Sequence, residues 1–344
     1  MPALPSIAVA IPTRNQSEYL VDALDSVFAQ TIQPVDVLVC DDAGDDNCEE
    51  VVEAYRVRLP ADAAAKLRYI RNGRCLGLGG NFDRAVREAK GEFVIKLDSD
   101  DMLEPLFSQT LGAELVQCGQ AGWAHVNALN ILKDKTPIRL AHTLKRPGFY
   151  NGAEALKGYL RHNDTCHCVM IRKTAYLEVG GYRPEMTAGE DWLLWLEMLI
   201  RGWGYVFLNE PLARMRKYDD RWELMTGRRR RFVESMKYMD GYLDRLLGEV
   251  GVPEGCTPVG VKNGFAGTAA SLCRSSAMDE GDSATRKLLF DAAVHYVPSA
   301  GNRLAALVFA PLPRRLTVAL AKISEIPRDL VRWGIGILKQ RRRP

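Results

Sequence analysis

Uninterrupted apolar runs recur along the N-terminal third of the chain, each too short for a helix and each bounded by polar residues. Such runs are typical of strands that are covered on both faces. The predicted strands lie at residues 7–11, 35–40, 67–70 and 93–97. Pro12 is expected to end the first of them, because proline cannot donate to a strand ladder.

Segments of helical periodicity separate these runs. Leu20 and Leu24 share one helical face behind Ser17, which is a suitable N-cap. Further helices are predicted around residues 51–55 and over residues 81–89. Strands that alternate with helices imply right-handed crossovers, and therefore an α/β fold with a mostly parallel central sheet flanked by helices.

The alternation weakens in the second half of the chain. The pattern there predicts strands at residues 123–132, 166–172 and 205–208 and a helix at residues 191–200. After residue 226 the chain reads as helical and basic. We therefore expect one α/β domain over residues 1–225 and a helical C-terminal region over residues 226–344.

The formal net charge of +3 hides an asymmetry between the body of the chain and its C-terminal end. Residues 301–344 contain ten Lys and Arg against Glu325 and Asp329, a net charge of +8, which leaves −5 for residues 1–300. An acidic body argues against nucleic-acid binding, which depends on a broad basic face. Nucleic acid is therefore not an expected partner.

The basic C-terminal end also has an amphipathic pattern. In a helix that begins at Pro327, Arg328 and Arg332 lie opposite Leu330 and Trp333. Such a helix can lie in a membrane interface with its cationic face toward anionic headgroups. The alternative is that the apolar face packs on the rest of the protein and the basic residues are simply solvated.

Neither export nor a membrane span is predicted. The N-terminus lacks a charged segment followed by an apolar stretch, and no run of about 18 uncharged apolar residues occurs. The eight cysteines are scattered without a C-x-x-C pair, which favours a reduced chain. These features predict a cytoplasmic protein, which the basic tail can hold peripherally on the cytoplasmic face of the inner membrane.

Polar residues follow each predicted strand of the first half. The clusters are residues 13–15, 41–42, 71–72 and 98–101. Ligands of a parallel sheet bind in the crevice at the carboxyl ends of its strands. Because four strand ends carry polar side chains, the sequence predicts one binding crevice there.

The last of these clusters contains the pair Asp98-x-Asp100. Carboxylate oxygens are the ligands that Mg²⁺ or Mn²⁺ takes while it also holds substrate phosphates. A solvated acidic turn is the alternative, since aspartate is common in turns. The position directly after a buried strand and beside Asp101 favours a divalent-metal site.

Two further features near the first strands suit a nucleotide. Asp42 can accept a hydrogen bond from the ring N–H of uracil, thymine or guanine, although capping a helix is an alternative role for it. Gly77 and Gly79 lead into a helix at Asn81, so that backbone N–H groups can approach a phosphate there. The dinucleotide fingerprint needs a glycine where Phe82 stands, and no P-loop sequence occurs.

Two sites in the second half carry titratable side chains. Glu190 and Asp191 precede an apolar helix, where a carboxylate can remove a proton from an alcohol or can simply complement the helix dipole. Cys166, His167 and Cys168 suggest zinc, but alternation within a strand would point His167 away from both sulfurs. A zinc site is therefore not expected.

The order of these motifs resembles family-two glycosyltransferases of the GT-A fold. The likeness covers about residues 5–220 and is densest in the first half. The motifs that carry it are residues 7–15, Asp41-Asp42, Asn72 with Gly77-x-Gly79-x-Asn81, residues 97–101, Gly180-Gly181-Tyr182 and Gly189-Glu190-Asp191-Trp192.

The resemblance implies an inverting transfer of a sugar from a nucleotide diphosphate donor, most of all a UDP-sugar, to an acceptor hydroxyl. It also implies synthesis of a bacterial surface polysaccharide or glycolipid, with a carbohydrate or lipid-linked saccharide as acceptor. Asp191 would be the base, beside Glu190, and Asp98 and Asp100 would bind the divalent ion. The donor would contact Pro12, Arg14, Asp42, Arg71, Asn72, Gly77, Gly79, Asn81, Asp98 and Arg216.

One motif departs from the family. Many relatives carry Tyr-Arg-x-His after the last strand, with the histidine near the metal or diphosphate. Here Arg216 is retained, but Tyr218 stands in the place of the histidine. Lys217 or Arg214 can neutralise phosphate instead.

Two other functions use similar elements. A nucleotidyltransferase also has paired aspartates, but its glycine-rich loop after the first strand is absent from residues 13–17. A nucleotide-sugar-binding module without transferase activity would not need Asp98, Asp100 and Asp191 together. The identity of the sugar, the acceptor and the oligomeric state stay open at this point.

Overall fold

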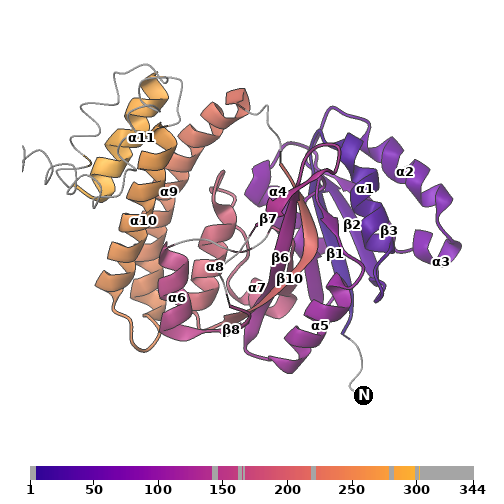
Figure 1. The fold of residues 1–344 in the computed structure, drawn as a ribbon, viewed down its shortest axis with the longest axis horizontal. Coiled ribbons are helices and arrows are strands. Elements are labelled where there is room, and N and C mark those ends of the chain that lie inside the picture. The colour runs from indigo at the N-terminus through magenta and orange to yellow at the C-terminus, as the bar shows by residue number, and fades with distance from the viewer. Residues whose placement is uncertain are drawn as a thin grey trace, which may run out of the picture. The chain divides into compact units, whose positions relative to one another are not determined.

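The computed structural model describes residues 5–141, 146–161, 165, 167–217, 222–278, 283–298 and 302 (Figure 1). The strands are β1 Ile7–Thr13, β2 Asp36–Asp41, β3 Leu67–Arg71, β4 Phe93–Lys96, β5 Met102–Leu103, β6 Ala121–Ile131, β7 Pro137–Leu140, β8 Gly148–Tyr150, β9 Val169–Arg172 and β10 Gly204–Arg216. The helices are α1 Ser17–Phe28, α2 Cys48–Arg58, α3 Ala61–Ala64, α4 Gly77–Glu88, α5 Phe107–Gln117, α6 Gly152–Arg161, α7 Lys173–Glu178, α8 Glu190–Ile200, α9 Trp222–Val250, α10 Pro258–Met278 and α11 Ser283–Tyr296.

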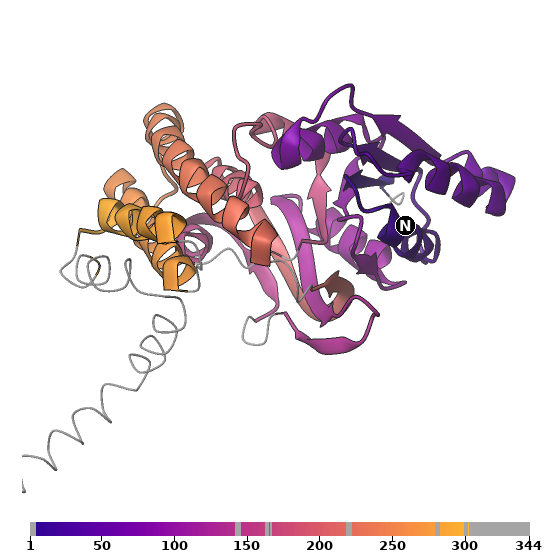
Figure 2. The ribbon, with the colours of Figure 1, turned by 90° about the horizontal axis from the view of Figure 1, so that it is seen from above.

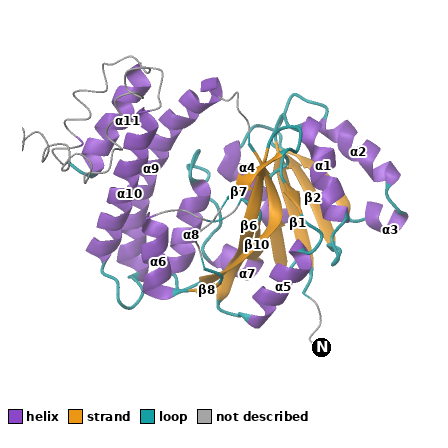
Figure 3. Ribbon diagram, viewed as in Figure 1, coloured by secondary structure: helices purple, strands orange, loops and turns teal. Residues whose placement is uncertain are grey.

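The strands form one sheet in the order β3-β2-β1-β4-β9-β6-β10-β5, with β7 beside β6 and β8 beside β10. The neighbours β3, β2, β1 and β4 run parallel. Strand β9 is antiparallel to both β4 and β6, and β10 is parallel to β6. Strands β1 to β4, β6 and β10 therefore share one direction, which confirms the mostly parallel sheet flanked by helices (Figure 3).

The apolar runs form the strands because both of their faces are covered. Every residue of β1 and β2 is buried. Leu20 and Leu24 of α1 belong to the same buried cluster as Val9 of β1 and Val37 of β2. Full burial of an aliphatic side chain contributes about 1.5–3 kcal/mol, so this cluster holds the N-terminal strands and α1 together.

Strand β1 continues through Pro12, which corrects the expected end of the first strand. Pro12 pairs with Cys40 and Thr13 with Asp41 of β2. Strand β4 pairs with β1 only as far as Ala10. The missing N–H of proline is tolerated there because β1 has no neighbour on that side beyond Ala10 within the described sheet.

Two helix starts also differ from the sequence prediction. Ser17 is the first residue of α1 rather than its N-cap, and its N–H donates to Asp46 Oδ2 at 2.8 Å. Helix α4 begins at Gly77 instead of Asn81. The carboxylate of Asp42, the residue after β2, accepts the N–H groups of residues 76 and 77 and so supplies hydrogen-bond acceptors that the helix start lacks.

The second half contains elements that the apolar pattern did not indicate, among them α5, α6, α7 and the short strands β5, β7 and β8. Strand β10 is also longer than the predicted residues 205–208. Its middle is exposed and its register with β6 shifts near Pro211, which breaks the simple apolar signature.

Contacts along the chain define two compact units, one of Met1–Arg221 with Ser235–Phe265 and one of Trp222–Glu234 with Ala266–Pro344. In the second unit, Cys273 and Ala277 of α10 pack with Leu289 and Phe290 of α11. Figure 2 also shows these two helices side by side. Helix α9 contributes to both units, and the division at residue 225 stays a prediction.

Cys166, Tyr218 and the amphipathic tail lie outside the described residues. Of the helices that the structure describes, none has both the length and the apolar character needed to cross a membrane. The predicted membrane contact of the tail stays a prediction.

Gly91 lies between α4 and β4 and tests the packing of the central strands. A Cβ at this position would lie 2.6 Å from the Ala8 backbone nitrogen and 2.7 Å from the Phe93 carbonyl oxygen. Because backbone must move to relieve such contacts, we expect Gly91→Ala to lower the free energy of unfolding by about 1–3 kcal/mol. Urea denaturation measures this change.

Gly119 provides the matched control, since a Cβ there would meet no atom within 4 Å. We expect Gly119→Ala to change the free energy of unfolding by less than about 0.5 kcal/mol. Equal stability of the two variants would show that the turn before β4 can shift away from β1.

Candidate functional site

The carboxyl ends of β1, β2, β3 and β4 lie side by side, as the polar clusters predicted. The backbone N–H of Asp42 donates to the Thr13 carbonyl at 2.9 Å, and the N–H of Asn72 donates to the Asp41 carbonyl at 2.8 Å. The N–H of Leu97 donates to the Ala10 carbonyl at 3.0 Å. These bonds extend the strand ladders to the first polar residues and so fix where their side chains begin.

Three buried polar side chains connect the ends of β1, β2 and β3 with α4. Asn72 donates from Nδ2 to Asp42 Oδ1 at 2.7 Å and to Asn81 Oδ1 at 3.0 Å. Asn81 in turn donates to the Cys40 carbonyl at 3.0 Å. Asp42 also accepts the N–H groups of Leu76 at 2.6 Å and of the following residue at 3.0 Å. Asp42, Asn72 and Asn81 therefore shape the crevice, whichever ligand it takes.

Two arginines border this network. Arg71 donates to the Gly44 carbonyl at 2.8 Å and lies 3.5 Å from the buried carboxylate of Asp41. Arg14 is exposed and lies 2.8 Å from the Cys75 sulfur. Both guanidinium groups are accessible at the crevice, which is the position that a nucleotide diphosphate requires of cationic side chains.

The backbone geometry of the protein accounts for glycine at positions 77 and 79. Gly77 has a φ of +78°, a left-handed conformation that favours glycine. A Cβ on Gly79 would lie 2.8 Å from the Arg183 carbonyl and 3.0 Å from the Met186 carbonyl. Gly79 thus permits close contact between α4 and residues 183–186, and its phosphate role stays a prediction.

The acidic turn after β4 faces a histidine and a lysine. Asp98, Asp101 and His167 each offer a ligand atom, and these atoms lie within 4.8 Å of one another. Asp100 is outside this group and accepts a hydrogen bond from Gln16 Nε2 at 3.3 Å. Two carboxylates and an imidazole are suitable ligands for a divalent ion such as Mn²⁺.

Lys96 is a member of the site that the sequence analysis did not identify. Its ammonium lies 3.0 Å from Asp98 Oδ1 and 4.2 Å from the centre of the Phe82 ring. Desolvation opposes the charged form, but Asp98 and Asp191 together raise the pKa of Lys96 above its ordinary value. A single lysine within an otherwise apolar strand, two residues before an aspartate, was the available signal.

The position of His167 also differs from the prediction. The strand begins at Val169, so the alternation argument does not apply to residue 167. His167 Nδ1 lies 3.5 Å from Asp98 Oδ2. Desolvation lowers the pKa of His167, and a neutral imidazole keeps the lone pair that a metal requires.

The pKa of Asp98 reflects these neighbours. Desolvation opposes ionisation of its carboxyl, but the charge of the Lys96 ammonium 3.0 Å away outweighs this effect and lowers the pKa of Asp98. The carboxylate is therefore ionised at neutral pH, as a metal ligand must be.

Arg216 contacts the acidic turn through both its side chain and its backbone. Its side chain is buried, with Nε donating to the Asp100 carbonyl at 3.0 Å and Nη2 to Asp22 Oδ2 at 3.1 Å. Its backbone N–H donates to Asp101 Oδ1 at 2.8 Å. These contacts indicate that Arg216 shapes the turn, and direct contact with a donor stays a prediction.

Glu190 and Asp191 begin α8 after Gly189, whose φ is +70°. Burial, followed by the charge of Asp191, raises the pKa of Glu190 to about 8. Asp191 is less buried, and its Oδ1 accepts the N–H of Trp192 at 2.8 Å. The two adjacent carboxyl groups therefore differ in environment, so Glu190 holds a proton at neutral pH.

Several known proteins with similar sequences are named as glycosyltransferases or polysaccharide synthases. Chondroitin synthase of Escherichia coli is 32% identical over 102 residues, which are 30% of this chain and 14% of that protein. An uncharacterized glycosyltransferase of Methanocaldococcus jannaschii is 24% identical over 221 residues, 62% of this chain and 71% of that protein. A GalNAc(5)-diNAcBac-PP-undecaprenol beta-1,3-glucosyltransferase of Campylobacter jejuni is 31% identical over 123 residues, 36% of this chain and 37% of that protein.

Among solved structures, residues 1–349 of S. aureus TarS have a similar fold. The TM-score is 0.62 at 16% identity, and the match covers 85% of this chain and 81% of that one. The same protein in complex with UDP-GlcNAc matches with a TM-score of 0.54 at 16% identity, over 88% of this chain and 90% of that one. This likeness confirms the GT-A fold expected from the sequence.

The family model named Glycosyl transferase family 2 matches residues 8–180, half of the 344-residue chain. The matched residues include the four strand ends, the acidic turn and the start of the loop before α8. The chain belongs to glycosyl transferase family 2.

Proposed function

We propose that this protein is an inverting glycosyltransferase that transfers a sugar from a UDP-sugar to a hydroxyl group of a carbohydrate or lipid-linked saccharide. The observation that carries the proposal is the group of Asp98, Asp101 and His167, whose ligand atoms lie within 4.8 Å of one another at the carboxyl end of β4 in a chain of glycosyl transferase family 2. A fold match that binds UDP-GlcNAc supports this choice of donor.

The donor's nucleotide would lie against the ends of β1 to β3. Asp42 and Asn72 would contact the base edge, with Pro12 and Arg71 beside it and Arg14 near the diphosphate. Two observations support this placement: both arginines are accessible, and the buried amides hold the crevice in a fixed shape. A preformed crevice reduces the entropy that donor binding must overcome.

The acidic turn would hold a divalent ion, and its ligand atoms fit one. The candidate ligands are Asp98 with Asp100, or Asp98 with Asp101 and His167, and the second set lies within the spacing that one ion can bridge. A bound Mg²⁺ or Mn²⁺ would offset the negative charge of the diphosphate. Lys96 already neutralises part of the charge on Asp98 and keeps that carboxylate in place.

Asp191 would act as the general base. It would take the proton of the acceptor hydroxyl while that oxygen forms a bond to the anomeric carbon and the bond to the diphosphate breaks on the opposite face. A single displacement of this kind inverts the anomeric configuration. Glu190 is less suited, because a carboxyl whose pKa is about 8 is largely protonated at pH 7.

The proposed acceptor rests on the name of one relative and on the cationic helix predicted for the C-terminal tail. One relative is named for a glucosyl transfer to an undecaprenol-linked glycan. The cationic face predicted for residues 328–339 would place the catalytic domain at an anionic membrane surface, where a lipid-linked acceptor is confined. We therefore propose a role in bacterial surface polysaccharide or glycolipid synthesis.

A panel of nucleotide sugars tests the donor class directly. Released nucleoside diphosphate is measured for UDP-, GDP- and dTDP-sugars with the full-length protein. We expect UDP-sugars to be hydrolysed fastest. No release from any donor would contradict the proposed transferase activity.

Asp191→Asn tests the base. The amide keeps the shape of the carboxylate but is not basic, so we expect turnover to fall by about 10²–10⁴-fold while UDP binding is unchanged. Asp62→Asn on the exposed surface of α3 is the matched control and should keep full turnover. Near-normal turnover of Asp191→Asn would assign the base to another residue.

Glu190→Gln tests the protonation of the buried partner. The folded protein holds a proton on Glu190 up to a pH of about 8, whereas the unfolded chain releases it near 4.5. The stability that this proton provides is therefore complete below pH 4.5 and is lost as the pH rises toward 8. Gln cannot ionise, so the free energy of unfolding of Glu190→Gln should rise relative to wild type by about 1 kcal/mol or more between the two ends of this range.

Urea denaturation at pH 5.5 and pH 8.5 provides the comparison for Glu190→Gln. If the free energy of unfolding differs between variant and wild type by the same amount at both pH values, Glu190 is ionised throughout this range. That result would contradict its assignment as the protonated neighbour of Asp191.

Asp98→Asn tests the metal site. We expect the variant to lose the part of UDP affinity that depends on Mn²⁺, about tenfold or more, because both candidate ligand sets include Asp98. Calorimetric titration with UDP, with and without Mn²⁺, measures this loss. Asp62→Asn is again the control.

The same titration separates the two ligand sets. A loss in Asp100→Ala without a loss in His167→Ala assigns the ion to Asp98 and Asp100, and the reverse result assigns it to the group with Asp101. A wild-type protein whose UDP affinity does not respond to Mn²⁺ or Mg²⁺ would exclude metal-dependent donor binding.

A further inference from the structure

The loop between α7 and α8 leads directly to the proposed base and has an unusual backbone. Gly180 and Gly181 have φ values of +82° and +78°, and Gly189 at its other end has +70°. These left-handed conformations suit glycine and are strained for other residues. A loop of this shape needs contacts from neighbouring elements to keep one conformation.

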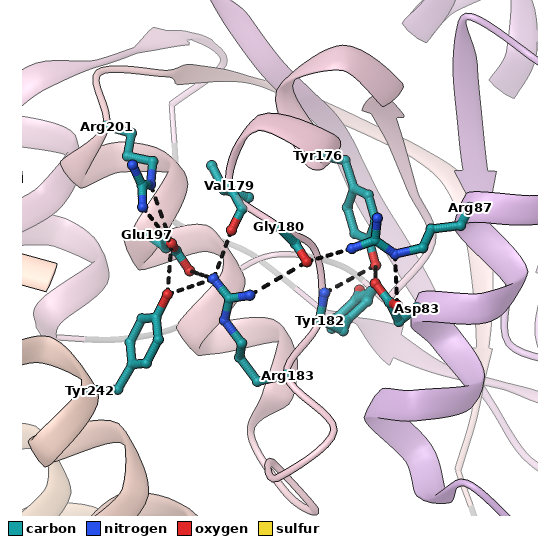
Figure 4. Close-up of polar contacts among 10 residues, drawn as sticks. All are labelled: Asp83, Arg87, Tyr176, Val179, Gly180, Tyr182, Arg183, Glu197, Arg201 and Tyr242. Carbon is teal, nitrogen blue, oxygen red and sulfur yellow. Dashed lines mark hydrogen bonds and ion pairs between the residues drawn. The ribbon is translucent and has the colours of Figure 1, made fainter. Parts of the chain in front are cut away.

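Helix α4 holds the first turn of this loop. Asp83 accepts hydrogen bonds from Tyr176 Oη at 2.8 Å and from Arg87 Nε at 2.7 Å, and Arg87 also donates to the Gly180 carbonyl at 2.5 Å (Figure 4). A Cβ on Gly181 would lie 2.3 Å from Asp83 Oδ1. The loop is therefore pressed closely against α4 at its start.

A second group of side chains, Arg183, Glu197 and Tyr242, holds the loop from its other side. We call this group the α9 clamp. Arg183 Nη2 lies 2.7 Å from the Val179 carbonyl, 2.8 Å from Glu197 Oε2 and 2.5 Å from Tyr242 Oη, so its two N–H groups are shared among three acceptors. One guanidinium group thus joins the backbone of the loop to α8 and α9, as Figure 4 shows.

The charge in the α9 clamp is compensated, although Glu197 is fully buried. Its Oε1 accepts hydrogen bonds from Tyr242 Oη at 2.8 Å and from Arg201 at 3.2 Å, and its Oε2 accepts from Arg183. A buried carboxylate is stable only when its lone pairs are satisfied by such donors. The loss of one donor should therefore loosen the arrangement and not merely remove one contact.

Helix α9 makes one more contact with the same loop. Ser235 is buried, and its Oγ accepts the backbone N–H groups of Thr187 at 3.1 Å and Ala188 at 3.2 Å. These two residues lie three and two positions before Glu190. The side chain of Ser235 therefore fixes the last residues of the loop before α8 begins.

We propose that Tyr242 and Ser235 are positioning residues for the transfer reaction, because they hold the loop of residues 179–189 and thereby fix the direction of Asp191. The inference rests on the proposed function, since it assumes that Asp191 acts on the acceptor. It adds that side chains of α9 set the geometry of the base.

Their contacts support positioning and not general packing. Ser235 bonds to the loop backbone, and Tyr242 bonds both to Arg183, which holds that backbone, and to Glu197 of α8. Small displacements of a catalytic group reduce the rate of the chemical step strongly. Donor affinity should be unaffected, because the nucleotide crevice at the ends of β1 to β3 makes none of these contacts.

Tyr242→Phe and Ser235→Ala test the proposal, and Tyr55→Phe is the matched control. Tyr55 of α2 likewise donates from Oη to a carboxylate, that of Asp25 in α1 at 2.8 Å, and is not part of the loop or of the α9 clamp. Hydrolysis of UDP-GlcNAc, UDP-glucose and UDP-galactose is measured with the full-length protein, together with UDP affinity and hydrogen exchange of peptides from residues 179–190.

For Tyr242→Phe and Ser235→Ala we expect kcat for the best donor to fall roughly tenfold, with unchanged KM and unchanged UDP affinity. Amide exchange of residues 179–190 should rise in both variants. Tyr55→Phe should keep the wild-type kcat and the wild-type exchange of this peptide. Tyr55→Phe removes a comparable hydrogen bond far from the loop in sequence, so it reports the effect of a general loss of stability. The expected combination of results therefore identifies a positioning role.

Three results would overturn the proposal. One is a wild-type kcat in both Tyr242→Phe and Ser235→Ala, and another is a fall in kcat without faster exchange of residues 179–190. The third is a parallel loss of kcat and UDP affinity, which would indicate a structural role for α9. A wild-type protein that neither binds UDP nor hydrolyses these donors would instead contradict the proposed function, and the inference with it.

Discussion

The ion pair between Lys96 and Asp98 is the interaction on which the candidate site depends. The carboxyl edge of the sheet brings several carboxylates into a crevice where water screens them poorly, so an unpaired negative charge there would destabilise the fold. Lys96 is buried, yet it remains cationic because Asp98 lies 3.0 Å away and Asp191 adds to the field. Arg216 stabilises the same turn by donating hydrogen bonds to the Asp100 carbonyl and the Asp101 carboxylate. The protein thus assembles an acidic site and supplies much of the balancing charge itself.

The cost of burying an unpaired negative charge also sets Glu190 apart from its neighbour Asp191 in α8. Glu190 is more deeply buried than Asp191, and it lies beside that second negative charge, so it retains its proton. Asp191 faces a more open environment at the helix start, where the helix dipole favours a negative charge. Neighbours in sequence therefore acquire different chemistry from their surroundings, which is the arrangement that an acid–base site needs.

The elements around α8 hold the loop that precedes these two carboxyl groups. Gly79 allows the backbone at residues 183–186 to lie close to α4, and the α9 clamp holds the loop from the other side. The part of the site proposed for catalysis thus follows a loop whose conformation no single element determines. The part proposed for the nucleotide is built on strand ends that the parallel ladder fixes.

The sequence by itself determined the parts of this protein that rest on local periodicity. Residues 7–11 and 35–40 predicted β1 and β2 because strands buried on both faces must be apolar throughout. Polar residues after these strands predicted the crevice, and the order of motifs predicted the family and its GT-A fold. Only the tertiary structure decided that Lys96 and His167 join Asp98, that α4 begins at Gly77, and that α9 reaches the loop before Asp191. These features depend on contacts between residues far apart in the chain, and local periodicity contains no information about such contacts.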